Sequence, residues 1–152
     1  MRRVYDLFVS GGRDSVVAAT IGYERARAEG AQARVVFIKE FELPPGLGVP
    51  DPEDYVRRFS EWLGAELVVL RPALDYWEGV KRWGYPMLFF HRWCFQKLKK
   101  EPLMEFLRRE YVVERVSPVW VVGVRRAESR RRERLFKDEW STVTLGGFNV
   151  RY

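Results

Sequence analysis

Short apolar runs alternate with longer segments of helical periodicity along this chain. Residues Val4 to Val9 form a mostly apolar run, as expected of a strand buried on both faces of a sheet. From Asp14 to Glu29 the apolar side chains recur on one helical face instead, and Gly30 follows as a C-terminal stop. The start of the chain therefore predicts a strand, a tight turn and a helix.

The alternation of strands and helices continues to residue 124. A β-rich run, Ala33 to Ile38, precedes a loop rich in proline and glycine, and Asp51-Pro52 then begins a helix that Gly64 ends. We assign this helix an apolar face made of Tyr55, Val56, Phe59, Trp62 and Leu63. The later elements are predicted strands at Glu66–Leu70 and Pro118–Val124 and predicted helices at Asp75–Trp83 and Pro102–Tyr111. Such an order predicts an α/β fold, a three-layer, Rossmann-like parallel sheet covered on both faces.

The C-terminal segment WSTVTLGGFNVRY has a different pattern. Two β-rich runs flank Gly146 and Gly147, which is typical of a β-hairpin. We expect this hairpin to form an antiparallel sheet edge or a homodimer contact. A chain of 152 residues suits one hydrophobic core, so a single domain over residues 1–152 is expected.

Composition and charge narrow the class of protein. Hydrophobic residues make up 47% and charged residues 32% of the chain, which is typical of a folded globular protein. The only cysteine is Cys94, so a single chain can form neither a disulfide nor a cysteine-ligated iron–sulfur cluster. Asp6 and Ser10 interrupt the first apolar run, and no segment approaches a membrane span, so we expect a cytoplasmic protein with no membrane association. The net charge of +6 favours anionic partners, either nucleotides or RNA.

The turn between the first strand and the first helix has the composition of an anion site. Its residues are Ser10, Gly11, Gly12, Arg13, Asp14 and Ser15. In a parallel sheet this turn lies at the carboxyl edge, beside the positive end of a helix. The two glycines allow positive φ and close approach of a phosphate, and the serine hydroxyls and the arginine add donors. We expect Asp14 to cap backbone amides or to orient a cation.

This turn matches neither a Walker loop nor a dinucleotide-binding turn. The sequence SGGRDS resembles instead the SGGxDS pyrophosphate loop of the ATP-pyrophosphatase superfamily, whose folds are called adenine nucleotide alpha-hydrolase-like. Members of that superfamily bind ATP, and many attach AMP to an acceptor with release of pyrophosphate. Two further segments, RPALDYWEGVKRWGYP with HRWCFQKLKKEPL and then GVRRAESRRR, resemble the phosphoadenylylsulfate (PAPS) reductase family within it. The resemblance covers residues 4 to about 134.

The resemblance and the predicted fold together assign site residues. The expected nucleotide- or phosphate-binding residues are Ser10, Gly11, Gly12, Arg13, Asp14, Ser15, Gly123, Arg125, Ser129 and Arg130. The expected catalytic residues are Asp14, Arg125 and Glu128, and possible substrate contacts are His91, Arg92 and Lys97. Arg131 and Arg132 are expected to face solvent. ATP or a PAPS-like nucleotide is the expected ligand, Mg²⁺ is expected to accompany ATP, and no metal ligand is assigned.

The chain also departs from the family pattern. PAPS reductases use a cysteine in a C-terminal Glu-Cys-Gly-Leu-His segment, which this sequence lacks, and Cys94 matches a position with no catalytic role. We therefore expect no reductase activity, and a domain shortened at its C-terminus. Lys39-Glu40 also stands where many relatives carry Asp-Thr.

Three functions remain open at this stage. The first is an adenylyltransferase-type ATP pyrophosphatase that activates an unknown acceptor. The second is a non-catalytic module, such as a partner subunit, that binds a nucleotide or sulfonucleotide. The third is an RNA-modifying enzyme, which the run RRAESRRRER and the aromatic residues Trp83, Tyr85 and Trp93 favour.

Overall fold

The computed structural model of the chain describes residues 1–86, 92–125, 127, 129–135, 138, 142–145 and 147–151. Its strands are β1 (Arg2–Phe8), β2 (Gln32–Ile38), β3 (Glu66–Leu70), β4 (Val116–Val122), β5 (Thr142–Leu145) and β6 (Phe148–Arg151). Its α-helices are α1 (Arg13–Ala28), α2 (Pro52–Leu63), α3 (Tyr76–Trp83), α4 (Glu101–Arg109) and α5 (Arg130–Leu135). Two π-helical segments, η1 (Phe95–Lys100) and η2 (Glu110–Glu114), flank α4.

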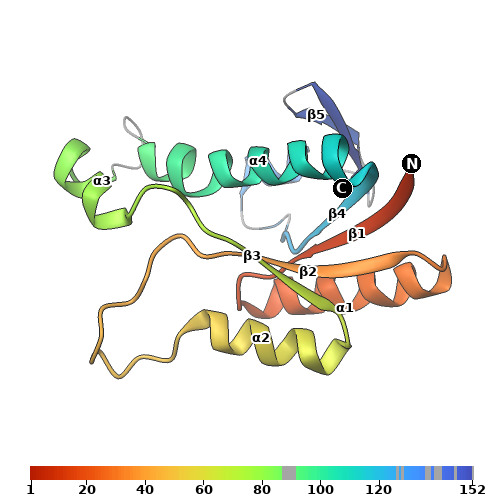
Figure 1. Cartoon of the computed structure of the whole chain (residues 1–152), viewed down its shortest axis with the longest axis horizontal. Helices are drawn as coiled ribbons and strands as arrows, with labels where there is room; N and C mark the ends of the chain where they lie inside the picture. The colour runs from red at the N-terminus through yellow and green to blue at the C-terminus, as the bar shows by residue number, and fades with distance from the viewer. Residues whose placement is uncertain are drawn as a thin grey trace.

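The strands form one sheet in the order β3-β2-β1-β4-β6-β5. All neighbouring pairs are parallel except β5 and β6, which are antiparallel. Figure 1 shows α1 and α2 against one face of the sheet and α4 against the other. The three-layer, Rossmann-like fold and the C-terminal hairpin are therefore confirmed. No helix in the described parts of the chain is long and apolar enough to span a bilayer.

Side chains of the central strand β1 alternate between two cores. Tyr5, Leu7 and Val9 are buried in the core that α1 and α2 cover. Phe8 faces the other side, where its ring meets that of Trp120 edge to face with 5.2 Å between centroids. Because both faces of the strand are covered, the sequence of β1 is a nearly continuous apolar run rather than a strict alternation.

The register of the sheet determines which residues meet at its carboxyl edge. Phe8, at the end of β1, lies opposite Val122, at the end of β4. The residues that follow each strand therefore emerge side by side, although more than a hundred positions separate them in sequence. This pairing brings the turn before α1 next to the segment that begins at Gly123.

A charged cluster lies buried beneath α4 on the second face of the sheet. Arg34 of β2 donates from Nη2 to Asp6 of β1 at 2.8 Å and also to Glu110 of η2, and its Nη1 donates to Glu114 at 2.8 Å. Asp6 and Glu110 are fully buried. Burial and the neighbouring Asp6 raise the pKa of Glu110 to about 9, and burial likewise raises the pKa of Asp6. Glu110 therefore holds a proton at neutral pH.

Two sequence expectations about helices need correction. The predicted helix at Pro102–Tyr111 starts earlier and ends later, because η1, α4 and η2 follow one another without a break. Pro102 removes one backbone hydrogen bond from the helix interior, and the wider π-helical turns before it accommodate that loss. On α2 the buried stripe is narrower than expected, because Tyr55 and Trp62 are 43% and 71% exposed.

Candidate functional site

The two glycines of the turn play different roles. Gly11 has a φ of +89°, in the left-handed region that favours glycine. Gly12 has a φ of −82°, so the expectation that it needs positive φ is wrong. A Cβ built on Gly12 would meet only the Ser10 hydroxyl, at an ordinary 3.6 Å. Glycine at position 12 is therefore not required by the backbone, and what it provides is open space in front of the helix.

The hydroxyl of Ser15 holds the turn in shape. It donates to the Gly12 carbonyl at 2.8 Å and accepts the Ser10 N–H at 3.2 Å. The Ser10 hydroxyl lies 3.3 Å from the same oxygen. Ser15 is buried, whereas Ser10 is exposed. The Ser15 hydroxyl therefore stabilises the conformation of the loop through these hydrogen bonds, whereas Ser10 is the serine that is exposed to solvent.

The amino end of α1 lacks the side-chain cap that its neighbours have. Asp51 accepts a hydrogen bond from the backbone N–H of Glu53 at the start of α2. Asp75 does the same at the start of α3, for the N–H groups of Trp77 and Glu78. At α1 the N-cap residue is Gly12, which makes no side-chain hydrogen bond. The first N–H groups of α1 are therefore exposed at the positive end of the helix, where an anion is stabilised.

Gly123 allows β4 to end against the backbone of this turn. A Cβ at position 123 would lie 2.5 Å from the carbonyl oxygen of Asp14 and 2.7 Å from the Cα of Ser15. These are backbone atoms in the first turn of α1, and they cannot move aside as a flexible side chain can. Gly123 is thus needed for close packing, which places the segment after β4 over the turn.

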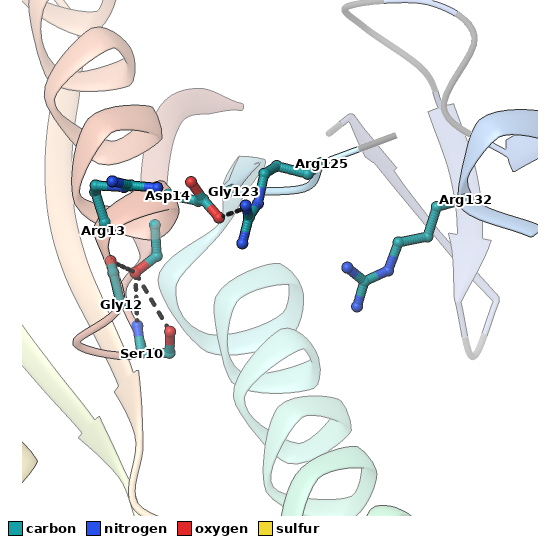
Figure 2. Close-up of a pocket in the computed structure, with 8 residues that line it drawn as sticks. Ser10, Gly12, Arg13, Asp14, Gly123, Arg125 and Arg132 are labelled. Atoms are coloured by element: carbon teal, nitrogen blue, oxygen red, sulfur yellow. Dashed lines mark hydrogen bonds and ion pairs between the residues drawn. The ribbon is translucent and has the colours of Figure 1, made fainter. Parts of the chain in front are cut away.

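An ion pair joins the two sides of the site. The Nε of Arg125 lies 2.7 Å from the Oδ2 of Asp14, as Figure 2 shows. Asp14 therefore pairs with Arg125 across the site, and its expected role toward a bound cation stays a prediction. Both side chains line a pocket of about 530 Å³, whose lining is Ser10, Gly12, Arg13, Asp14, Ser15, Gly123, Arg125 and Arg132. The pocket contains three arginines and one carboxylate, so its lining carries net positive charge.

Arg132 is exposed, as expected, but it also belongs to the site, which was not expected. It lines the pocket, and Figure 2 shows its guanidinium directed toward the space in front of Arg125. Arg130, which was expected to bind phosphate, is not among the lining residues. Ser129 acts as the cap of α5, because its hydroxyl accepts the N–H of Arg132 at 3.1 Å. Arg132 is the last arginine of the G-x-R-x-x-E-S-x-x-R pattern, so the sequence did contain the information needed to identify it.

The other expected contacts lie elsewhere. Glu128 and His91 fall outside the described residues, so the structure places neither of them. Lys97 pairs with Glu101 at 2.7 Å on the surface of the long helix, and neither Lys97 nor Arg92 lines the pocket. Cys94 does not line it either, so within the described residues no thiol faces this site.

A second, smaller pocket adjoins the first at Ser10. It has a volume of about 220 Å³ and is lined mainly by apolar residues of the β2 end and the following loop, with Phe37, Ile38, Phe41, Leu43, Val49, Pro50 and Pro52 among them. The sequence analysis did not identify this pocket, because its walls come from a loop whose conformation is not encoded in a periodic pattern. Ser10 lines both pockets, so the two pockets adjoin at the carboxyl edge.

Lys39 anchors the loop that forms this second pocket. Its ammonium group donates to Asp51 at 2.8 Å and to Glu53 at 2.9 Å, and lies 2.8 Å from Glu42. Burial alone would lower the pKa of Lys39, but the hydrogen bonds to Asp51, Glu42 and Glu53 outweigh it and raise the pKa. The same contacts with Lys39 lower the pKa of Asp51 and of Glu53. Lys39 is thus charged and fixed by three carboxylates.

An uncapped helix end and a glycine turn at the carboxyl edge of a parallel sheet form an anion-binding type of site, as found in α/β domains of the pyrophosphate-loop class. Within that class the chain belongs to the phosphoadenosine phosphosulfate reductase domain family, which matches residues 5–140. The family includes enzymes, and its nucleotide ligands include PAPS and ATP.

Two curated proteins of Methanocaldococcus jannaschii are similar to this chain. Uncharacterized protein MJ0973 is 33% identical over 141 residues, which cover 93% of this chain and 30% of the relative. Uncharacterized protein MJ0066 is 34% identical over 126 residues, which cover 81% of this chain and 23% of the relative. The chain therefore spans less than a third of the length of either relative.

Proposed function

We propose that this domain binds ATP with its phosphates at the Ser10–Ser15 loop and transfers the adenylyl group to an acceptor. The observation that carries the proposal is the uncapped amino end of α1, with an open glycine in front of it and Arg125 and Arg132 facing it. Backbone N–H groups at a helix start and guanidinium groups both favour phosphate oxygens. Their convergence on one pocket supports a polyphosphate ligand rather than a single carboxylate.

The proposed reaction needs no covalent intermediate on the protein. An oxygen of the acceptor attacks the α-phosphorus, the bond from that phosphorus to the bridging oxygen breaks, and pyrophosphate leaves with the electron pair. A hydroxyl acceptor would give up its proton to solvent. The loop N–H groups and the two arginines would offset the negative charge that accumulates on the leaving group, and the fixed loop would hold the reacting atoms in line.

The neighbouring apolar pocket is suited to the nucleoside. It shares Ser10 with the phosphate pocket, so a base in one and phosphates in the other would belong to a single ligand. The ring of Phe41 lines this pocket and offers an apolar surface to the base. Lys39, held by its three carboxylates, keeps the wall of this pocket in place.

A magnesium ion fits this site through one protein ligand. Asp14 is the only carboxylate among the lining residues, and Mg²⁺ commonly binds one or two carboxylates together with substrate phosphates. When bound with ATP, the ion would neutralise phosphate charge and polarise the phosphoryl oxygens. Asp14 now pairs with Arg125, so binding of the ion at Asp14 would release this arginine toward the phosphates.

The same ion pair favours a second candidate, a module that binds a nucleotide without turnover. With Asp14 neutralised by Arg125, the pocket can hold an anion without a metal ion. Pyrophosphate release in the presence of candidate acceptors separates the two candidates, because a module would bind ATP and release none.

The variant Gly12→Val tests the phosphate site. Position 12 tolerates a Cβ, and its extended backbone suits valine, so the fold should persist while the added methyl groups fill the space for a phosphate. We expect calorimetric titration to show ATP binding by the natural chain and at least a hundredfold weaker binding by Gly12→Val, as for loss of about 3 kcal/mol of contacts. Circular dichroism and thermal unfolding check the fold. Unchanged ATP affinity in a folded Gly12→Val protein would refute the proposal.

A further inference from the structure

A cluster of aromatic rings extends from the apolar pocket along α3. Phe41, which lines that pocket, lies 5.7 Å from Tyr76, whose ring is 5.0 Å from Trp77 and 5.8 Å from Trp93. Trp93 in turn lies 5.6 Å from Trp83. We call these five residues the aromatic cluster. Figure 1 shows α3 next to the start of the long helix, on the side where the loop after β2 extends.

The cluster exposes ring surface that a folded core would normally cover. Trp93 is buried at its centre, and α3 approaches it closely because Gly79 has no side chain. Phe41, Trp77 and Trp83, however, are 45% to 48% exposed. Trp83 packs directly on the buried Trp93, and Phe41 and Trp77 pack on the half-buried Tyr76, which itself contacts Trp93, so the exposed faces of the three rings form one continuous platform.

The sequence that carries this platform is strongly basic. Residues 79–100 include six lysines or arginines and no aspartate or glutamate. These basic residues are Lys81, Arg82, Arg92, Lys97, Lys99 and Lys100. Lys81, Lys97 and Lys99 form surface ion pairs with Glu78, Glu101 and Glu40, which are weak and exchange readily. Within the described residues Arg82 and Lys100 have no ion pair, so they are available to an anionic partner.

We propose that the aromatic cluster and its basic flank bind single-stranded nucleic acid. Unpaired bases of any type stack on exposed tryptophan rings, while lysine and arginine neutralise the backbone phosphates. A protein partner would need apolar contacts but not this excess of positive charge. Because Phe41 joins the cluster to the apolar pocket, a bound strand would run toward the nucleotide site and could be the acceptor. The acceptor role rests on the proposed function, whereas the binding does not.

The test uses a fluorescein-labelled oligouridylate of about 15 nucleotides and measures anisotropy with the whole chain. This probe contains no adenine, so its base differs from that of the proposed nucleotide ligand. We expect Trp77→Ala to weaken binding roughly tenfold through loss of stacking. Arg82→Ala should lower the slope of log affinity against log salt by about 0.7, as for one lost phosphate contact.

Exposed residues of the same types on α2 provide matched controls. Trp62 is 71% exposed and Arg58 is exposed, and both lie on the opposite layer of the molecule. Trp62→Ala and Arg58→Ala should leave oligouridylate binding nearly unchanged. Gly12→Val should abolish ATP binding and keep oligouridylate binding, so failure of one proposal is distinguishable from failure of the other.

Three results would overturn the inference. The first is no binding of oligouridylate at about 50 mM salt, where phosphate contacts are strong. The second is an equal, salt-screened loss in Arg82→Ala and Arg58→Ala, which would indicate that the strand binds only to the general positive charge of the surface. The third is self-association of the natural chain that Trp77→Ala abolishes while oligouridylate binding persists, which would make the cluster a protein interface.

Discussion

Two of the three arginines that line the phosphate pocket, Arg125 and Arg132, come from the chain after β4, and Arg130 lies between them in sequence but outside the pocket. Arg125 follows β4 and Arg132 belongs to α5, whereas Arg130 does not line the pocket. A hydrogen bond to a charged group contributes about 1.5–3 kcal/mol. We therefore expect Arg125→Ala and Arg132→Ala each to weaken ATP binding roughly tenfold to a hundredfold, and Arg130→Ala to change it little, as measured by calorimetric titration.

Arg125→Ala also leaves the Asp14 carboxylate without its ion-pair partner. Weaker ATP binding in this variant therefore has two sources, the lost contact of Arg125 and the repulsion of phosphate by Asp14. The double variant Asp14→Asn with Arg125→Ala separates the two effects, because it lacks both charges of the pair. If affinity returns fully in the double variant, Arg125 acts only by neutralising Asp14. Equal losses in all three single arginine variants, vanishing at high salt, would contradict a specific phosphate contact.

At the scale of elements, the predictable parts of the fold were those encoded in local patterns. The glycine turn, the Asp51-Pro52 helix start and the C-terminal hairpin follow from neighbouring residues, and all three occur. The buried cluster of Asp6, Arg34 and Glu110 could not be predicted in this way, because its members are far apart in sequence. Asp6 even looked like an interruption of an apolar run. Only the register of β1 with β2 brings it opposite Arg34.

In the candidate site, too, the features that depend on neighbouring residues could be predicted from the sequence, and those that depend on distant residues could not. The Ser10–Ser15 loop and its place at the carboxyl edge were predictable, since they depend on one strand and one helix. The hydrogen bonds that the Ser15 hydroxyl makes within the loop depend on the orientation of this side chain, which the sequence does not reveal. The choice between Arg130 and Arg132 depends on how α5 turns after its Ser129 cap. The apolar pocket depends on a loop held by Lys39, and two of the three carboxylates that bind Lys39, Asp51 and Glu53, lie at or beyond the far end of that loop.

The buried cluster predicts a pH dependence of stability. Glu110 has a pKa of about 9 in the folded chain against 4.5 when exposed, so the folded state holds more protons between these values. Stability should therefore fall as pH rises through this window, by up to about 1.4 kcal/mol per pH unit from this group. In Glu110→Gln the amide can accept from Arg34 and donate to Asp6, so the decline should be shallower. Urea unfolding between about pH 5 and pH 8 measures it.

The exposed Glu105 of α4 supplies the control for this measurement. Glu105→Gln should keep the pH dependence of the natural chain. The carboxylates with lowered pKa, Asp51 and Glu53, titrate below this window and should not disturb it. A Glu110→Gln protein whose stability declines with pH as steeply as the natural chain would show that Glu110 is ionised in the folded state.

At the scale of the whole molecule, the sheet has β3 at one edge and β5 at the other within the described residues. An unpaired strand edge can accept a further strand. The homodimer expected from the C-terminal segment stays a prediction. In its simplest form, β5 of one chain would pair with β5 of a second chain across a twofold axis. Sedimentation equilibrium should show a dimer that Thr144→Pro disrupts. Thr144 lies opposite Asn149 in a pair that exchanges no backbone hydrogen bonds within the hairpin, so its N–H faces the open edge, where proline cannot donate to a strand partner. A monomer at all concentrations would contradict this prediction.

The Lys39 anchor has a consequence for how the chain could be divided. Lys39 on one side and Asp51 and Glu53 on the other join the two ends of the exposed loop between them, so a break in that loop would leave its ends connected by charge. One fragment would carry β1, β2 and the Ser10–Ser15 loop, and the other would carry β3, β4, Arg125 and Arg132. The fragments would reassemble through strand pairing of β2 with β3 and of β1 with β4. The nucleotide site would then exist only in the reassembled pair, so its occupancy would report that two separately expressed halves had met.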